Sequence, residues 1–409
     1  MTSPSVAPNS SQRAIRLLLI TRGLRAFVDG YVAILLPVYL LALGMNTLDV
    51  GLLSTATLLG SAALTLAVGA WGHHLASRGL LLSAAILMAA TGLAFISADG
   101  FWPLLLVAFV GTLNPSAGDV SVFLPLEHAQ IANVTTDINR TTIFARYSLT
   151  GSLCAALGAL CVAVPEALST YGIEHLNALR WMFVFYALIG MTVYILYRQL
   201  PTQHAHEEIA RPAPLKESRA VVVRIAALFC VDSFAGGLVL NSLLALWLFE
   251  KFDLSLAAAG SFFFWSGLLS AFSQLAAPRV AQRIGLLNTM VFTHIPANIF
   301  LILAALAPTL PLAIVLLFLR ALLSQMDVPT RSAYVMSMVT PPERAAAASF
   351  TATPRSLAAA LGPTLGAAMF AAGYLAAPMV LAGGLKIAYD LALWRSFRLH
   401  EVDEKPPIA

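Results

Sequence analysis

The chain has 409 residues, of which 59% are hydrophobic and only 11% are charged, and its net charge at pH 7 is +4. A soluble domain carries about 25% charged residues and has too small an interior to hide so much apolar surface. This composition therefore excludes a soluble globular protein, and the scattered positive charge excludes the basic patch of a nucleic-acid-binding protein.

Apolar runs long enough to cross a membrane recur along the whole chain. A helix needs about 20 apolar residues to span the hydrocarbon. The sequence predicts an all-α integral membrane protein with twelve transmembrane helices, at 16–44, 49–71, 78–98, 101–126, 142–165, 178–198, 221–249, 255–278, 286–307, 311–338, 344–370 and 374–395. The polar N-terminus lacks a signal-peptide pattern, so we expect the first helix to remain in the mature protein.

The longest polar segment inside the chain lies at 198–219 and separates two groups of six helices. Its proline and charge content favours a solvated linker. Lysine and arginine concentrate in alternate loops, which places both termini in the cytoplasm of a bacterial-type inner membrane. We expect an N-terminal tail at 1–15, a six-helix bundle at 16–198, a linker at 199–220, a second bundle at 221–396 and a C-terminal tail at 397–409.

The two groups of helices repeat one another. At a shift of 204 residues, 121–158 aligns without gaps on 325–362, and a slightly different shift aligns the first helix of each group. The matched pairs are Pro125 with Pro329, Arg140 with Arg344, Gly158 with Gly362 and Gly30 with Gly237. We therefore expect parallel six-helix repeats with a solute site between them, near the middle of the membrane.

The fourth predicted helix contains residues that weaken a helix. Its middle reads Asn114-Pro115-Ser116-Ala117-Gly118-Asp119. Proline and glycine loosen the helix and expose backbone carbonyls beside Asp119, which suits a binding site within the membrane.

Two similar six-helix halves joined by a charged loop resemble the major facilitator superfamily. The hallmark of that family is G-x-x-x-D-R-x-G-R-[RK] between helices two and three. The segment at 69–78, GAWGHHLASR, keeps this spacing from Gly69 to Arg78, with His73 in place of the acid and His74 in place of the first arginine.

The second half carries further fragments of the pattern. The copy of the hallmark keeps Arg283 and Gly285 and has Gln282 where the acid stands. Gly362 and Pro363 begin a G-P-x-x-G segment that is similar to the antiporter motif of exporters in the family. The resemblance implies that these residues, together with those at 69–78, take part in conformational change.

Ionisable side chains within membrane helices are costly and usually functional. Here they gather on helices one, four, seven and ten, which line the central cavity in the family that the chain resembles. The candidates for a substrate and proton cavity are Asp29, Tyr31, Asn114, Asp119, Asp232, Arg320 and Asp327. Asp29 and Asp119 are the first candidates for carrying a proton, and Arg320 for holding an anionic group.

A second set of charges, Arg25, Glu127, Arg146 and Arg331, lies towards the predicted cytoplasmic ends. Such side chains either reach out to the interface or lock the two halves together. Because the repeat aligns Glu127 with Arg331 and brings Arg25 close to Asp232, we expect these opposite charges to pair across the halves.

The resemblance implies a secondary active transporter of a small solute that works by alternating access. The sequence has no nucleotide-binding P-loop and no hydrolase motif, so we expect an ion gradient as driver, no enzyme activity, no cofactor and no metal. Proton-coupled efflux by an antiporter is the first hypothesis, and an uptake symporter, a uniporter or a non-transporting receptor are the alternatives. The expected partners are the substrate and membrane lipids, with no nucleic acid, and the expected state is a monomer.

Overall fold

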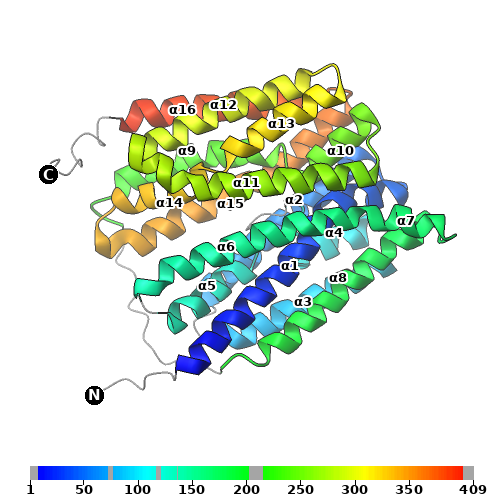
Figure 1. Ribbon diagram of the computed structural model, residues 1–409, viewed down its shortest axis with the longest axis horizontal. Coiled ribbons are helices and arrows are strands. Elements are labelled where there is room, and N and C mark those ends of the chain that lie inside the picture. The colour runs from blue at the N-terminus through cyan, green and yellow to red at the C-terminus, as the bar shows by residue number, and fades with distance from the viewer. Residues whose placement is uncertain (1–7, 72–76, 117–120, 136, 202–214, 399–409) are drawn as a thin grey trace. The chain divides into compact units, whose positions relative to one another are not determined.

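The computed structural model describes residues 8–71, 77–116, 121–135, 137–201 and 215–398. Within these ranges all regular secondary structure is helical (Figure 1). The chain divides into two compact units, Met1–Glu207 with Leu254–Phe264, and Glu208–Asp253 with Trp265–Ala409. We call them unit 1 and unit 2.

The helices of unit 1 follow one another with short connections. They are α1 (Pro8–Ala42), α2 (Thr47–Trp71), α3 (Ser77–Ser97), α4 (Phe101–Val110), α5 (Phe123–Val134), α6 (Asp137–Leu160), η2 (Cys161–Ala163), α7 (Val164–Thr170) and α8 (His175–Tyr197). The first turns of α11 (Leu256–Ile284) also belong to this unit.

The start of α11 joins unit 1 because side chains and backbone of that unit hold it. The carboxylate of Glu166 on α7 accepts the backbone N–H groups of Leu256 at 2.8 Å and Ala257 at 3.3 Å. A negative group at a helix N-terminus satisfies donors that have no partner within the helix. The division after Glu207 lies within the expected linker at 199–220, and the first unit also includes Leu254–Phe264.

Unit 2 contains the remaining helices. They are α9 (Arg219–Gly237), α10 (Asn241–Phe252), the rest of α11, α12 (Leu286–Leu306), α13 (Leu310–Ser324), α14 (Asp327–Ser337), η3 (Pro341–Glu343), α15 (Arg344–Ala371) and α16 (Ala377–Phe397).

In the described residues, nine helical segments are long and apolar enough to cross a membrane, which makes the chain a multi-pass membrane protein. The expected spans outside this set are the fourth and the last two. The fourth is interrupted, since α4 ends at Val110 and α5 begins at Phe123, in agreement with Pro115, which disfavours helical geometry in the residue before it. The last two form α15 and α16, which carry buried charges. The number twelve stays a prediction.

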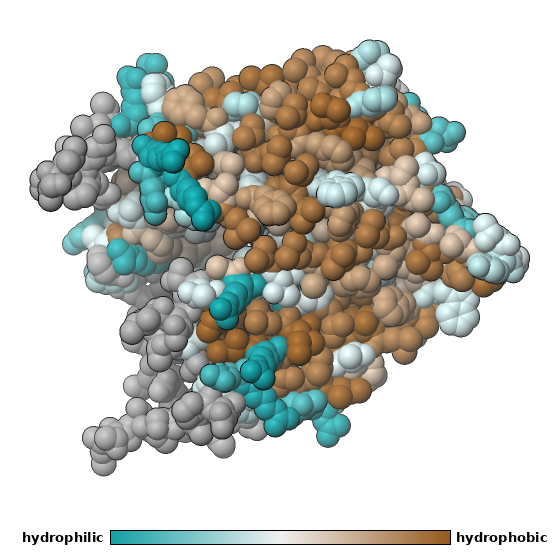
Figure 2. All heavy atoms as spheres, in the orientation of Figure 1, coloured by the Kyte–Doolittle hydropathy of each residue, from teal (hydrophilic) through white to brown (hydrophobic). Residues whose placement is uncertain are grey.

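The outer faces of the helices are apolar in both units. Figure 2 shows hydrophobic side chains along the flanks of the helices, with hydrophilic side chains gathered towards helix ends. Leu106 and Leu188 of unit 1 and Phe272 and Leu361 of unit 2 each expose more than half of their surface. Such extensive exposed apolar surface fits contact with lipid.

Close helix crossings in the two units use the glycines matched by the sequence repeat. In unit 1, α1 crosses α6 so closely that a Cβ added at Gly30 would lie 2.0 Å from the carbonyl oxygen of Ala155. In unit 2, α9 crosses α15, and a Cβ at Gly362 would lie 2.3 Å from the backbone of Gly237. Small residues allow membrane helices to approach in this way.

Substitution of Gly362 by alanine is expected to destabilise the protein by about 1–3 kcal/mol, because the backbone of α9 has to move away. Gly384 on α16 is the matched control, since an added Cβ there meets nothing within 4 Å. Thermal unfolding in detergent should show a lower Tm for Gly362→Ala and an equal or higher Tm for Gly384→Ala, because alanine favours a helix over glycine. Equal melting of the two variants would contradict the crossing.

Glu343 holds the segment that leads into α9. Its carboxylate accepts backbone N–H groups from Lys216 at 2.7 Å, Glu217 at 3.0 Å and Ser218 at 2.9 Å. Because these bonds favour the ionised form, they lower the pKa of Glu343 from 4.5 to about 2.

The lowered pKa predicts an acid-sensitive contribution to stability. A carboxyl group with a depressed pKa in the folded state stabilises the fold above its unfolded pKa and loses this effect as pH falls. The contribution of Glu343 should therefore be complete above about pH 4.5 and decline towards about pH 2. Over this window the Tm of the native protein should fall more than that of Glu343→Gln. Parallel curves would show that the contact adds no stability.

Candidate functional site

The carboxylate of Glu127 on α5 lies at the centre of a buried cluster in unit 1. Its exposed fraction is 0%. Thr21 donates to Oε1 at 3.0 Å and Tyr197 at 2.6 Å, while Arg25 and Tyr147 donate to Oε2. These donors come from α1, α6 and α8, so one carboxylate ties four helices together with its charge compensated by Arg25.

Two arginines of α1 pack on aromatic rings beside this cluster. The guanidinium of Arg25 lies 4.2 Å from the ring centroid of Phe123, and that of Arg22 lies 5.1 Å from the ring of Tyr147. Both arginines are buried, so neither reaches out to the membrane interface. Arg146 on α6 is exposed, as expected of an interfacial side chain.

Asp29 lies one turn further along α1 and is 9% exposed. The side chain of Asn114 lies beside its carboxylate, with Arg25 and Arg22 nearby. Oδ1 of Asn114 accepts from the backbone N–H and hydroxyl of Ser116, at 3.1 and 2.7 Å. The Asn114 amide nitrogen is therefore the group that can donate to Asp29. Among the described residues Asp29 forms no ion pair.

The other cavity candidates of unit 1 have different surroundings. Tyr31 is fully buried, and its hydroxyl donates to the backbone carbonyl of Met182 on α8 at 2.9 Å. Its hydroxyl is therefore used in packing α1 against α8. Asp119 lies outside the described residues.

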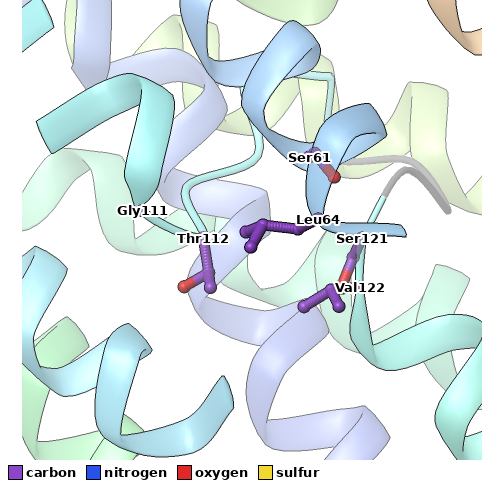
Figure 3. A pocket seen from close by; sticks show the side chains of 6 residues that line it. All are labelled: Ser61, Leu64, Gly111, Thr112, Ser121 and Val122. Carbon is purple, nitrogen blue, oxygen red and sulfur yellow. The ribbon is translucent and has the colours of Figure 1, made fainter. Parts of the chain in front are cut away.

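A small pocket lies beside the interrupted fourth segment (Figure 3). Its lining residues are Ser61 and Leu64 of α2, Gly111 and Thr112 after α4, and Ser121 and Val122 before α5. The space amounts to about 180 Å³, including the part open to solvent. Pockets for drug-sized ligands occupy about 300–1,000 Å³, so this pocket by itself is too small for such a solute.

Unit 2 contains a second buried cluster, centred on Asp232 of α9. Lys386 of α16 donates to Oδ1 at 2.5 Å, and Arg331 of α14 lies 3.3 Å from Oδ2. Arg331 also pairs with Asp327, one turn before it on α14. Nε2 of His294 on α12 lies 4.0 Å from Oδ1 of Asp232. The cluster connects α9, α12, α14 and α16.

His294 extends this cluster to a further carboxylate. Its Nδ1 lies 3.0 Å from Oδ1 of Asp390 on α16. Both side chains are buried. Arg355 of α15 borders the cluster, where its Nε donates to the hydroxyl of Ser233 at 3.1 Å.

Arg320 on α13 stands apart from these networks. It is half-buried and forms no ion pair among the described residues, and its Nε has no hydrogen-bond partner. The buried residues Leu317 and Ala321 adjoin it, whereas Leu319 and Leu322 are exposed. At 100° per residue, Arg320 therefore lies on the side of α13 that faces away from lipid.

The expected pairing of Glu127 with Arg331 and of Arg25 with Asp232 across the halves stays a prediction, and the ion pairs among the described residues lie within each unit. Glu127 pairs with Arg25 inside unit 1, and Arg331 pairs with Asp327 and Asp232 inside unit 2. Each charge has an opposite charge on its own or a neighbouring helix, which the alignment of the repeats does not reveal.

Most of the described residues of the predicted conformational motifs lie at helix ends. Arg78 at the start of α3 donates to the backbone carbonyl of Arg198 at 2.5 Å. Gly69 is near the end of α2, and His73 lies outside the described residues. Gln282 and Arg283 are exposed in the last turn of α11. Gly285 has φ +88°, a conformation that favours glycine. Gly362 and Pro363 lie within α15.

Sequence reasoning missed the polar partners in both clusters. Thr21, Tyr147 and Tyr197 looked like ordinary packing residues in apolar helices. His294 is an ionisable residue inside a membrane helix, a feature that by itself indicates a functional site.

The chain matches a known protein family and a sequence relative over most of its length. The model of the Major Facilitator Superfamily matches residues 18–303 and 225–409. The uncharacterized membrane protein YJR124C of Saccharomyces cerevisiae is 27% identical over an alignment of 423 residues that covers 94% of each chain.

Solved structures share the fold at low sequence identity. A bacterial homolog of the human lysosomal transporter Spinster, inward-facing and occupied, has a TM-score of 0.74 and 15% identity, with complete coverage of both chains. The nucleoside transporter NupG has a TM-score of 0.71 and 14% identity, covering 94% of this chain and 99% of that one. The human organic anion transporter MFSD10 has a TM-score of 0.63 and 16% identity, covering 96% and 100%.

Proposed function

The chain belongs to the major facilitator superfamily and is a membrane transporter of a small solute, not an enzyme, and we propose that it is a secondary active exporter that exchanges its solute for protons. Transport would proceed by alternating access between the two halves. We place it in a bacterial-type inner membrane with both termini in the cytoplasm, on the basis of the lysine and arginine distribution.

The single observation that carries proton coupling is the setting of Asp29. This carboxylate is buried on α1 beside the neutral side chain of Asn114. Of the two neighbouring cations, Arg25 and Arg22, Arg25 is already engaged by Glu127. A buried carboxylate that lacks an ion pair gains from binding a proton and releases it when water reaches the site.

The other acidic candidates for proton binding either pair with cations or lie outside the described residues. Asp232 and Asp327 both share Arg331, and Asp232 also binds Lys386. Glu127 accepts four hydrogen bonds, so we assign it to holding α1, α5, α6 and α8 together. Asp119 remains a second proton candidate on the grounds of its sequence position.

Arg320 is the proposed contact for the solute. A cation on the inner side of α13, with no acidic partner in the described residues, suits an anionic group of a ligand. We therefore propose a solute with a carboxylate, phosphate or similar group. The fold alone does not choose the substrate, since a nucleoside transporter and an organic anion transporter both share it.

A thermal-shift screen tests this proposal. Purified protein in detergent is combined with anions, cations, zwitterions and neutral sugars at two pH values, because a ligand that binds the native state raises Tm. Anionic compounds should raise the Tm of the native protein. Arg320→Gln should lose this shift, while its Tm without ligand should equal that of the native protein without ligand. A shift from cations or neutral sugars alone would contradict the assignment of Arg320.

Uptake by a symporter or passage through a uniporter are the alternatives within the same fold. A symporter moves the solute in the same direction as the proton, and a uniporter moves no proton. Vesicles of known orientation distinguish them, because an exporter accumulates solute inside inverted vesicles when their interior is acidic, whereas a uniporter only equalises the solute.

A further inference from the structure

Asp390 in unit 2 is a buried carboxylate with an incomplete set of hydrogen bonds. It is 1% exposed, its Oδ1 contacts Nδ1 of His294 at 3.0 Å, and its Oδ2 has no hydrogen-bond partner. An ionised oxygen without a partner in an apolar interior is costly. A proton on the Asp390–His294 pair reduces this cost, because it compensates the negative charge.

His294 lies between two carboxylates that come from different helices. When its neutral ring donates from Nδ1 to Asp390, Nε2 is an acceptor that faces Oδ1 of Asp232 at 4.0 Å. Two acceptors at this distance do not bind each other. A proton added at Nε2 turns the ring into a donor towards both carboxylates, and histidine is the side chain that exchanges protons most readily near neutral pH.

Charged side chains of four helices surround His294. Lys386 on α16 and Arg331 on α14 oppose a proton on His294, but they are paired with Asp232 and Asp327. Arg355 on α15 is a further cation and is hydrogen-bonded to Ser233. Arg320 is a cation on α13. The ring of Tyr389 on α16 lies 6.4 Å from the ring of His294. Among the described residues, the carboxylate of Asp390 forms an ion pair only with His294.

We propose that His294 and Asp390 form a binding site for one proton in unit 2, and that Asp232 transmits its occupancy to the neighbouring helices. An N–H bond forms at Nε2 as an O–H bond of a hydronium ion breaks and leaves water, and the new donor points at Oδ1 of Asp232. Lys386 donates to the same oxygen at 2.5 Å. Proton binding therefore competes with the ion pair that joins α9 to α16.

The proposed site belongs to unit 2, whereas Asp29 belongs to unit 1. Proton binding at His294 stands on the contacts within unit 2 alone. Its use in moving solute rests on the proposed function, in which a proton gradient drives transport.

Histidine-selective ¹⁵N NMR of the purified protein in detergent tests the site without solute or gradient. The His294 signal is identified by its absence in His294→Gln and is followed between about pH 5 and pH 8. The ¹⁵N shifts of its two ring nitrogens distinguish the neutral ring from the ring that carries a second proton. Asp390→Asn should weaken proton binding about tenfold or more, and Lys386→Met should strengthen it.

Trp394→Phe is the matched control. Trp394 on α16 donates to Asn288 on α12 at 3.2 Å, so this variant removes a contact between the same two helices without changing a titratable group. Its His294 ring should bind a proton as tightly as in the native protein. A His294 ring that never carries the second proton, or equally tight proton binding in the native protein and Asp390→Asn, would overturn the proposal whatever the transport assays show.

Discussion

Replacement of Glu127 by alanine is expected to lower the free energy of unfolding by about 3–5 kcal/mol, as found when one partner of a buried ion pair is removed. The variant leaves Arg25, 2% exposed, without a carboxylate. It also leaves the hydroxyls of Tyr147 and Tyr197 without their acceptor. Thermal and denaturant unfolding in detergent measure the loss.

Two further variants separate charge from packing in this cluster. The double variant Arg25→Met, Glu127→Leu should recover much of the stability, because it removes both charges together. Asp99→Ala is the control for an exposed pair, since Asp99 and Arg180 are 2.6 Å apart but partly solvated, and it should cost less than about 1 kcal/mol. Equal losses in Glu127→Ala and Asp99→Ala would contradict the central role of Glu127.

Asp29→Asn is expected to abolish proton-coupled transport while the Tm stays close to the native value. Asparagine has the size of aspartate and can accept a hydrogen bond from Asn114, but it cannot bind and release a proton. Solute flux in proteoliposomes with an imposed pH gradient measures the effect, with a solute taken from the thermal-shift screen.

Asp99→Asn supplies the matched control for this experiment. It removes an acid from the same unit at an exposed position and should leave transport unchanged. Proton coupling that persists in Asp29→Asn would remove Asp29 from the mechanism, and Asp119 would be tested next.

Hydropathy predicted the class of the fold because lipid demands long apolar helices with internally satisfied backbones. The interruption of the fourth span followed from Pro115, since a proline restricts the residue before it. The matched glycines Gly158 and Gly362 were visible as a repeat, and the structure gives their physical reason in the close helix crossings.

The polar clusters could not be derived in the same way. Glu127 takes its partners from positions 20 to 106 residues away, and nothing in an apolar helix distinguishes a tyrosine that binds a carboxylate from one that only packs. The pairing of Arg331 with Asp232 likewise depends on how α14 lies against α9, which no sequence spacing encodes. An ionisable residue could be recognised as important, but its partner could not.

The most direct test of the account is the movement of protons caused by solute. Native protein is reconstituted with a pH-sensitive dye inside the vesicles, and a solute identified by thermal shift is supplied to the outside. In the native protein we expect solute to move protons across the membrane in the direction opposite to its own flux. In Asp29→Asn we expect solute to cause no proton movement. Solute flux with no accompanying proton movement in the native protein would contradict the account.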